Sequence, residues 1–327
     1  MAKTCIGIDL GGTYVKFGLV NEHRRAVGDV FSLPTPANPQ PDDIVNVMAS
    51  GVEKIIAQHS LAREDILGVG VGAPGPLSVK RGILLQLPNM QTMRNFPLRD
   101  RVSQAVHLPA TLENDANAAA YAEYICGAGE GTHDMVMFTL GTGVGGGIIL
   151  GGKVLHGANE MGGEVGHIIV HPNGRPCPCG QRGCLEQYGS AMNLAKYATH
   201  RIREEKPVSR LTELLDAEGQ IDAKDIHDAF RGGDLFAGEL WDEVAYYLAL
   251  GCVSICRLFD PDRIVFAGGM TKAGDDLLEP IREHFQEQNW TMLETHTTLA
   301  IASLGADAGA IGAAGVAWDT FDPRPIR

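Results

Sequence analysis

The sequence of 327 residues lacks a long hydrophobic run, and it lacks an excess of positive charge. A membrane-spanning helix needs about 18 to 20 consecutive apolar residues, and no stretch reaches that length. The net charge is −13, whereas nucleic acid and anionic membrane surfaces both require a basic face. A secretory signal is also missing before the first apolar strand. We therefore expect a cytoplasmic protein with no nucleic-acid or membrane partner.

The seven cysteines are an odd number, and no secretion signal supports a disulfide framework. Cys5, Cys126, Cys252 and Cys256 lie among apolar residues, and we expect them to be reduced core side chains. Cys252 and Cys256 are four residues apart on an expected helix, which would also suit a metal. Packing is the favoured interpretation for that pair.

The other three cysteines fall within residues 160–186. Cys177, Cys179 and Cys184 follow His167, which lies ten residues before the first of them. Thiolate and imidazole are the ligands that zinc prefers, and four protein ligands leave no open position for water, so the pattern predicts a structural zinc site. The Cys-x-Cys-Gly spacing differs from that of thioredoxin-like centres, which argues against a redox site. A chance cluster is the remaining alternative.

Two regions share one order of elements, namely a strand, a glycine turn with a threonine, and two further strands. These are strand 5–9, turn 11–13 and strands 14–20 and 27–32 in the first region, and strand 135–140, glycine run 141–147 and strands 148–150 and 153–156 in the second. Two such hairpin turns facing each other would line a cleft with backbone N–H donors for phosphates. The chain length favours two domains.

Helices and short apolar strands make up the rest of the chain. The expected helices are 42–59, one ending over 102–106, one from 114 to 124, 190–203, 211–215, 223–232, 235–259, 277–288 and 305–318, and the expected strands are 66–72, 111–113, 263–267 and 299–302.

Asp9 ends the first strand directly beside the glycine turn. A bare carboxylate would repel phosphates, so Asp9 should hold Mg²⁺, directly or through water, if this turn binds phosphates. A glycine hairpin with a capping aspartate is the alternative.

Asn114 and Asp115 stand where a strand gives way to a helix, a position that faces the ligand crevice in α/β folds. One of the two would suffice as a helix cap, and Glu113 precedes them, so a functional role is favoured over capping alone. Gly268 and Gly269, at another strand end, permit flat contact with a ring such as adenine, although turn geometry explains them equally well.

These motifs together resemble the ROK family of sugar kinases and repressors. The residues that carry the resemblance are 9–13, 113–117, 140–147, 164–167 and the cysteine run 177–186. The resemblance covers essentially the whole chain and implies a two-domain, actin-like (ribonuclease-H-like) ATPase fold of the α/β class with a structural zinc site. The implied domains are a small one, 1–117 plus 306–327, and a larger one, 118–305, with the active site in the cleft between them.

The resemblance also implies roles for individual residues. Asp115 would be the catalytic base. The sugar would contact Gly75, Asn89, Asn114, Asp115, Glu164, His167 and Glu186. The nucleotide would contact Asp9, Gly11, Gly12, Thr13, Lys16, Gly141, Thr142, Gly143, Gly268 and Gly269. Zinc (Zn²⁺) would be held by His167, Cys177, Cys179 and Cys184, and the second ring nitrogen of His167 would face a sugar hydroxyl.

The implied activity is phosphorylation of a hexose by ATP and Mg²⁺, with the 6-hydroxyl of glucose as the expected target. Fructose, mannose, allose, N-acetylglucosamine and N-acetylmannosamine remain open, because Glu164 and Glu186 do not distinguish them. A non-catalytic sugar-sensing regulator is the other alternative. Family repressors carry an N-terminal DNA-binding module, whereas the Asp9 motif begins this chain at once. The family also favours a homodimer or homotetramer, for which helix 235–259 could supply an interface, although core packing explains that helix equally well.

Overall fold

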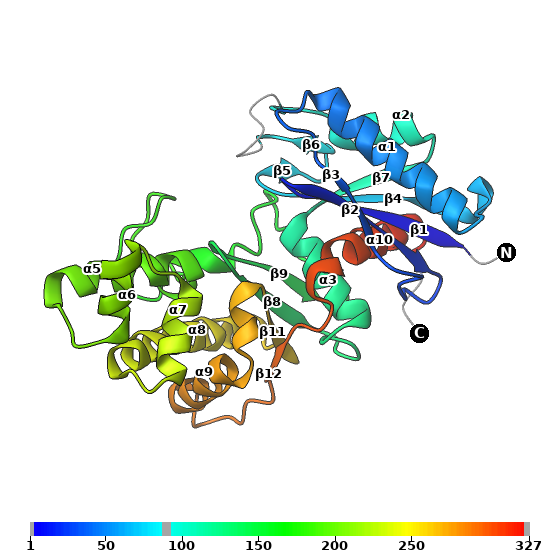
Figure 1. Ribbon diagram of the computed structural model, residues 1–327. Coiled ribbons are helices and arrows are strands. Elements are labelled where there is room, and N and C mark those ends of the chain that lie inside the picture. The colour runs from blue at the N-terminus through cyan, green and yellow to red at the C-terminus, as the bar shows by residue number, and fades with distance from the viewer. Residues whose placement is uncertain (1–2, 87–92, 324–327) are drawn as a thin grey trace.

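The computed structural model describes residues 3–86 and 93–323, and two five-stranded mixed sheets dominate it (Figure 1). The first sheet has the order β3-β2-β1-β4-β7 and the second β10-β9-β8-β11-β12. The strands of the first are β1 (Thr4–Leu10), β2 (Tyr14–Asn21), β3 (Phe31–Pro34), β4 (Ile66–Ala73) and β7 (Ala110–Asn114). Those of the second are β8 (Met135–Leu140), β9 (Val144–Leu150), β10 (Lys153–Val154), β11 (Arg263–Ala267) and β12 (Thr298–Ile301). A small hairpin consists of β5 (Leu77–Ser78) and β6 (Ile83–Leu84).

The two sheets have the same topology. In each, the first three strands form an antiparallel meander, and two later strands add in parallel beside the first strand of that meander. This confirms the predicted relation between the two glycine-turn regions. The α/β class is also confirmed, and the duplicated mixed sheets are consistent with the actin-like arrangement.

Helices cover both faces of each sheet. Their bounds are α1 (Pro41–Gln58), α2 (Leu98–Val106), α3 (Asp115–Cys126), α4 (Glu186–Gly189), α5 (Ala191–Glu205), α6 (Arg210–Glu218), α7 (Ala223–Arg231), α8 (Leu235–Phe259), α9 (Asp275–Gln288) and α10 (Ala308–Phe321). Helix α10 packs on β1 and β4, α3 packs on β9, and the two helices pack on each other, so this pair lies between the two sheets (Figure 1).

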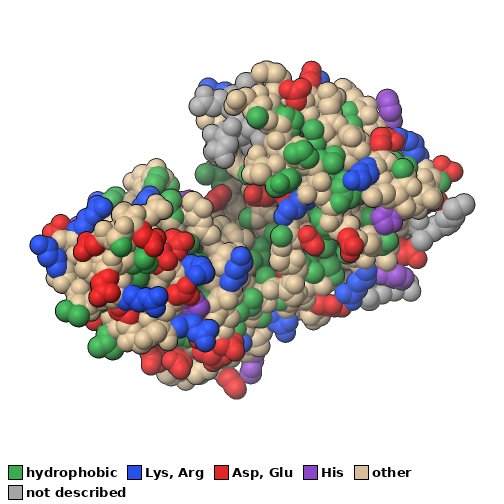
Figure 2. Space-filling view, viewed as in Figure 1, with side chains coloured by type: hydrophobic (Ala, Val, Ile, Leu, Met, Phe, Trp, Pro, Cys, Tyr) green, Lys and Arg blue, Asp and Glu red, His purple; other side chains and the backbone are tan. Residues whose placement is uncertain are grey.

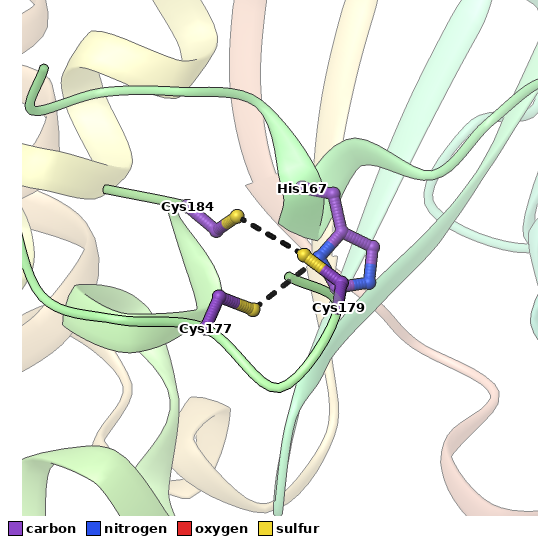
Figure 3. A group of neighbouring side chains, drawn as sticks. All are labelled: His167, Cys177, Cys179 and Cys184. Carbon is purple, nitrogen blue, oxygen red and sulfur yellow. Dashed lines mark hydrogen bonds between the residues drawn. The ribbon is translucent and has the colours of Figure 1, made fainter. Parts of the chain in front are cut away.

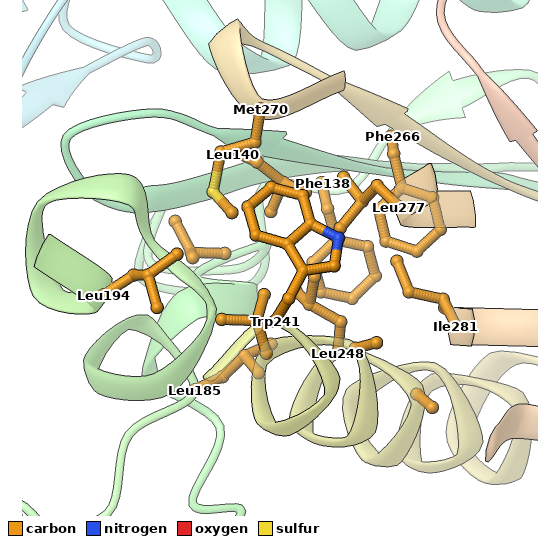
Figure 4. Packing of buried hydrophobic residues seen from close by; sticks show 14 of the residues in the cluster. Phe138, Leu140, Leu185, Leu194, Trp241, Leu248, Phe266, Met270, Leu277 and Ile281 are labelled. Atoms are coloured by element: carbon orange, nitrogen blue, oxygen red, sulfur yellow. The ribbon is translucent and has the colours of Figure 1, made fainter. Parts of the chain in front are cut away.

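Each sheet has its own buried core. Residues of α1 and α2 pack with the first sheet, whereas α8 and α9 pack with the second. In the second core, Trp241 of α8 lies against Phe138 and Leu140 of β8 and donates its indole N–H to the Asp276 carbonyl at 2.8 Å (Figure 4). The apolar residues of α8 are therefore used mainly in the core, as are the buried Cys252 and Cys256. Among the described residues, no helix combines the length and apolar character needed to cross a bilayer.

Two expected elements differ in the structure. The strand expected over 27–32 begins only at Phe31, because Gly28 takes a φ of 70° and interrupts the extended chain. The glycine run 141–147 is not one long turn. Its turn is confined to residues 141–143, and Val144 already begins β9, which places Gly145, Gly146 and Gly147 within a strand.

Small residues allow α10 and α3 to approach closely. A Cβ added to Gly312 of α10 would lie 1.6 Å from the Ala118 carbonyl oxygen of α3, so no side chain fits there. By contrast, a Cβ on Gly238 of α8 would meet nothing closer than a Phe230 ring atom at 3.9 Å.

We expect Gly312→Ala to lower the free energy of unfolding by about 1–3 kcal/mol, because it forces the two helix backbones apart. Gly238→Ala is the matched control, since both glycines are helical. It should be neutral or stabilising by up to about 1 kcal/mol through helix propensity. Urea unfolding monitored by circular dichroism measures both changes, and equal stability of the two variants would contradict the packing argument.

Candidate functional site

The carboxyl ends of three parallel strands form one edge of the first sheet. Asp9 of β1 pairs with Gly72 of β4, which pairs with Glu113 of β7, so the segments that follow these residues lie side by side. Those segments are the turn 11–13, the turn containing Gly75, and Asn114-Asp115. Sheet edges of this kind carry ligand sites in α/β folds.

Asn114 and Asp115 are held by the first turn of α3. The Asn114 Oδ1 accepts hydrogen bonds from the backbone N–H groups of Ala116 at 3.0 Å and Asn117 at 3.2 Å, so Asn114 is a genuine N-cap. Asp115 Oδ1 also accepts from the Ala116 N–H, at 2.8 Å. One carboxylate oxygen of Asp115 is thereby oriented, and no hydrogen bond within the described residues engages the other. Capping therefore does not use all the polar atoms at this junction.

Burial raises the pKa of Asp115 above its ordinary value, and the hydrogen bond from the Ala116 N–H opposes that rise. A carboxylate with a raised pKa is a better proton acceptor than an exposed one. This suits a general base that works near neutral pH.

Asp9 is a second, partly exposed carboxylate at this edge. Burial raises its pKa to about 6, Lys16 lowers it, and the nearby Asp115 raises it further. A Cβ on Gly309, in the first turn of α10, would lie 2.6 Å from the Asp9 carboxylate, so glycine lets this group approach the helix N-terminus. The Lys16 Nζ donates to the Ala306 carbonyl at 2.5 Å, just before the same helix. The sequence motifs did not point to Gly309, because its role depends only on tertiary packing.

The two glycine turns are each closed by a backbone hydrogen bond. Gly11 N–H donates to the Tyr14 carbonyl, and Gly141 N–H donates to the Gly143 carbonyl, both at 3.0 Å. Thr13 and Thr142 are exposed at these turns.

Helix α3 brings Asp115 to the second sheet. A Cβ on Gly147 of β9 would lie 2.6 Å from the Ala120 Cβ and 3.1 Å from the Asn117 Cα, so this strand accepts the helix only because it has glycine there. The strand portion of the glycine run thus serves packing, and the expectation that all of it forms a phosphate turn is wrong.

Glu164 and Glu186 approach the same region from residues 160–186. The short 3₁₀ helix η2 (Val165–His167) packs on the start of β9, and Glu164, exposed, immediately precedes it. Glu186 begins α4, and its Oε2 accepts a hydrogen bond from the Val144 N–H at 3.1 Å. The Glu186 carboxylate and the backbone that follows Glu164 therefore lie near the end of the second glycine turn.

His167, Cys177, Cys179 and Cys184 converge, and their ligand atoms all lie within 4.8 Å of one another (Figure 3). The Cys179 and Cys184 sulfurs are 3.6 Å apart, and the Cys177 sulfur is 3.8 Å from His167 Nδ1. Tetrahedral zinc with bonds of about 2.0–2.3 Å requires ligand separations of this size. The cluster thus supplies a donor set that suits zinc, and the histidine atom that faces the Cys177 sulfur is Nδ1.

Glu113 is a buried carboxylate whose contacts the sequence motifs did not predict. It is 1% exposed and accepts hydrogen bonds from the Asn114 N–H at 2.9 Å and the Asn117 Nδ2 at 3.0 Å. The His156 Nε2 lies 2.7 Å from its other oxygen, and this hydrogen bond raises the pKa of His156. The hydrogen bonds of Glu113 therefore connect the end of β7 to His156, which lies in the segment that leads to Glu164.

A cavity of about 870 Å³ adjoins Thr142. Its walls come from α5, from the segment between α6 and α7 and from the start of α7, and they carry Lys196, Arg203 and Lys224. Gly268 and Gly269 are not among its lining residues. A Cβ on Gly268 would lie 2.4 Å from the Leu140 carbonyl oxygen, so Gly268 is packed against the strand that leads into the second turn. Figure 2 shows the surface hollowed between the part built on the first sheet and the part that carries these helices.

Most predicted site residues are thus brought to one region by the two sheets and α3. Asn89 lies outside the described residues.

Comparisons with known proteins show the family to which the chain belongs. The model of the ROK family matches residues 5–320. A glucokinase from Halalkalibacterium halodurans is 39% identical over 308 residues, which are 94% of this chain and 92% of that protein.

Two solved structures extend the similarity to the fold. A ROK hexokinase from Thermus thermophilus has a TM-score of 0.83 at 32% identity, covering 98% of this chain and 100% of that one. A ROK family glucokinase from Streptomyces griseus in complex with glucose and AMPPNP has a TM-score of 0.74 at 37% identity, covering 96% of this chain and 98% of that one.

The raised pKa of Asp9 predicts a stability cost in the ligand-free protein. Its pKa rises from 3.8 in the unfolded chain to about 6 in the fold, so ionisation is penalised as pH rises through that window. At pH 7.5 in EDTA, Asp9→Asn should therefore stabilise the protein, by up to about 3 kcal/mol.

The gain should fall below about 1 kcal/mol near pH 4, where the folded carboxyl is protonated and the unfolded one is only about half ionised. Urea unfolding at the two pH values measures it, with the exposed Asp216→Asn as the control. A gain that is the same at both pH values would contradict the assigned cause.

Proposed function

Since this chain belongs to the ROK family, we propose that it is an ATP-dependent hexose kinase that phosphorylates the 6-hydroxyl of D-glucose. The observation that carries the proposal is the position of Asp115. One carboxylate oxygen of Asp115 is oriented by a hydrogen bond, and the other is available. Helix α3 holds Asp115 at the sheet edge that carries the first glycine turn, and the same helix packs against β9, the strand that follows the second glycine turn.

The phosphates of ATP would lie between the turns 11–13 and 141–143, where backbone N–H groups can donate to them. Asp9, beside the first turn, would hold Mg²⁺, which supplies positive charge to offset that of the phosphates. Lys16 would support this end of the site. The nucleoside would extend toward the cavity next to Thr142, with Gly268 and Gly269 as the flat contact for adenine.

The sugar would lie between Asp115 and the segment that carries Glu164 and Glu186. Ionised carboxylates suit a neutral sugar because each can accept hydrogen bonds from two neighbouring hydroxyls. Asn114 uses its Oδ1 for capping, which leaves its Nδ2 to donate to the sugar. Gly75, with a φ of 81°, would complete the pocket from the first sheet, and His167 Nε2 would face a hydroxyl.

The reaction would proceed by attack of the 6-hydroxyl oxygen on the γ-phosphorus while Asp115 accepts the hydroxyl proton. The backbone N–H groups of both turns would stabilise the charge that develops on the transferred group. The two domains proposed for this chain, 1–117 plus 306–327 and 118–305, would close over the substrates and exclude water. The separate cores of the two sheets support that division.

Zinc in the site formed by His167 and the three cysteines would cross-link the loop between Glu164 and Glu186. We assign it a structural role, because the four side chains complete its coordination. We further propose a cytoplasmic homodimer or homotetramer.

A coupled assay of ADP release with a panel of hexoses tests the function. Glucose should give the highest kcat/KM, and ADP release without sugar should be slow. A preference for another hexose would correct the substrate, whereas sugar-independent or absent ADP release would overturn the kinase assignment in favour of a sugar-binding regulator.

Asp115→Asn should lower kcat by about 10²–10⁴-fold, the usual contribution of a general base. Glucose affinity should change little, because asparagine can still accept the Ala116 N–H. In the unmodified protein, kcat should fall as pH drops through the raised pKa of Asp115, since the base must be ionised. Steady-state kinetics and glucose calorimetry measure these effects, and a near-normal kcat would rule out the assigned role.

Purified protein should contain about one zinc ion per chain, since the cluster supplies one complete set of four ligands. Cys177→Ser should lose that zinc and raise the KM for glucose, because the loop between Glu164 and Glu186 loses its cross-link. Cys126→Ser, a free cysteine outside the cluster, is the control. Metal analysis measures the zinc content, and steady-state kinetics measures the KM for glucose. Unchanged zinc content and KM in Cys177→Ser would refute the zinc assignment.

A further inference from the structure

The Glu186 carboxylate rests directly on the second glycine turn. Its Oε2 accepts the Val144 N–H at 3.1 Å, and a Cβ on Gly143 would lie only 2.3 Å from the same oxygen. A later residue of the same segment contacts the other side of the turn, where the Ala191 N–H donates to the Gly141 carbonyl at 2.9 Å. A residue expected at the sugar is therefore also part of the phosphate turn.

This contact places a negative charge where the proposed function places a phosphate. The Gly141 N–H is used within the turn, and the Val144 N–H is used by Glu186. In the ligand-free protein, a carboxylate thus lies against Gly143 of the turn proposed to bind phosphate, and it would repel the incoming phosphate at short range.

The contact is also easily exchanged. At 3.1 Å the bond is longer than a typical hydrogen bond to a charged group, and no other hydrogen bond to the Glu186 carboxylate is present within the described residues. Sugar hydroxyls that offer two donors to this carboxylate would draw it away from Val144. Glu164, the other carboxylate expected at the sugar, makes no such contact with the turn and is exposed.

We propose that Glu186 couples the two substrates: without sugar its carboxylate occupies the second phosphate turn, and bound sugar withdraws it so that the turn accepts ATP. The inference rests on the proposed function for the identity of the ligands. It predicts positive coupling between sugar and nucleotide, which by linkage must be reciprocal.

Binding of AMPPNP with Mg²⁺, measured by calorimetry with and without glucose, tests the coupling. Glucose should tighten AMPPNP binding to the unmodified protein. Glu186→Gln keeps an oxygen for the Val144 N–H but removes the charge. It should bind AMPPNP about three- to tenfold more tightly without sugar, and glucose should add little. Glu186→Ala should behave in the same way if the charge is the cause.

Glu164→Gln is the matched control. It should weaken glucose binding but leave the sugar-free Kd for AMPPNP unchanged, because that carboxylate does not touch the turn. Equal or weaker sugar-free AMPPNP binding by both Glu186 variants overturns the inference. That outcome is separate from failure of the proposed function, which would appear as absent sugar-dependent ADP release by the unmodified protein.

Discussion

The close packing of α3 between β9 and α10 is the constraint on which the site depends. Gly147 admits the helix on one side, and Gly312 admits it on the other. Because each approach leaves no room for a Cβ, the helix has little freedom to shift along either neighbour. Asp115 stands at the N-terminus of this helix, so its position relative to both glycine turns follows from backbone packing rather than from a flexible loop.

A second constraint acts through Val144. Its N–H binds Glu186, and η2, which follows Glu164, packs on the start of its strand. The residue that follows the second glycine turn is thus in contact with both ends of the proposed zinc loop. These contacts connect the proposed sugar side of the site to the proposed phosphate side, although the segments involved are distant along the chain.

Two partly exposed carboxylates at the site carry an energetic cost when they ionise. Asp9 and Asp115 both have raised pKa values because burial disfavours their ionised forms. Glu113 is buried even more deeply but is compensated by His156 and by the amide of Asn117. The carboxylates with raised pKa values are the two expected to meet Mg²⁺ and a proton, whereas Glu113 supports the structure. The raised pKa values thus separate the carboxylates expected to take part in the reaction from the carboxylate that supports the structure.

The sequence by itself determined the order of elements, the duplicated strand-and-turn pattern and the cysteine-histidine cluster, because these depend on local periodicity and on ligand spacing. It also identified Asp9 and Asp115, since a carboxylate at a strand end is a local feature. Only the tertiary structure assigned Gly145, Gly146 and Gly147 to packing, brought Gly309 to Asp9, paired His156 with Glu113 and set Glu186 on Val144. Each of these contacts joins segments that are distant along the chain, and their geometry follows from how the sheets and helices pack.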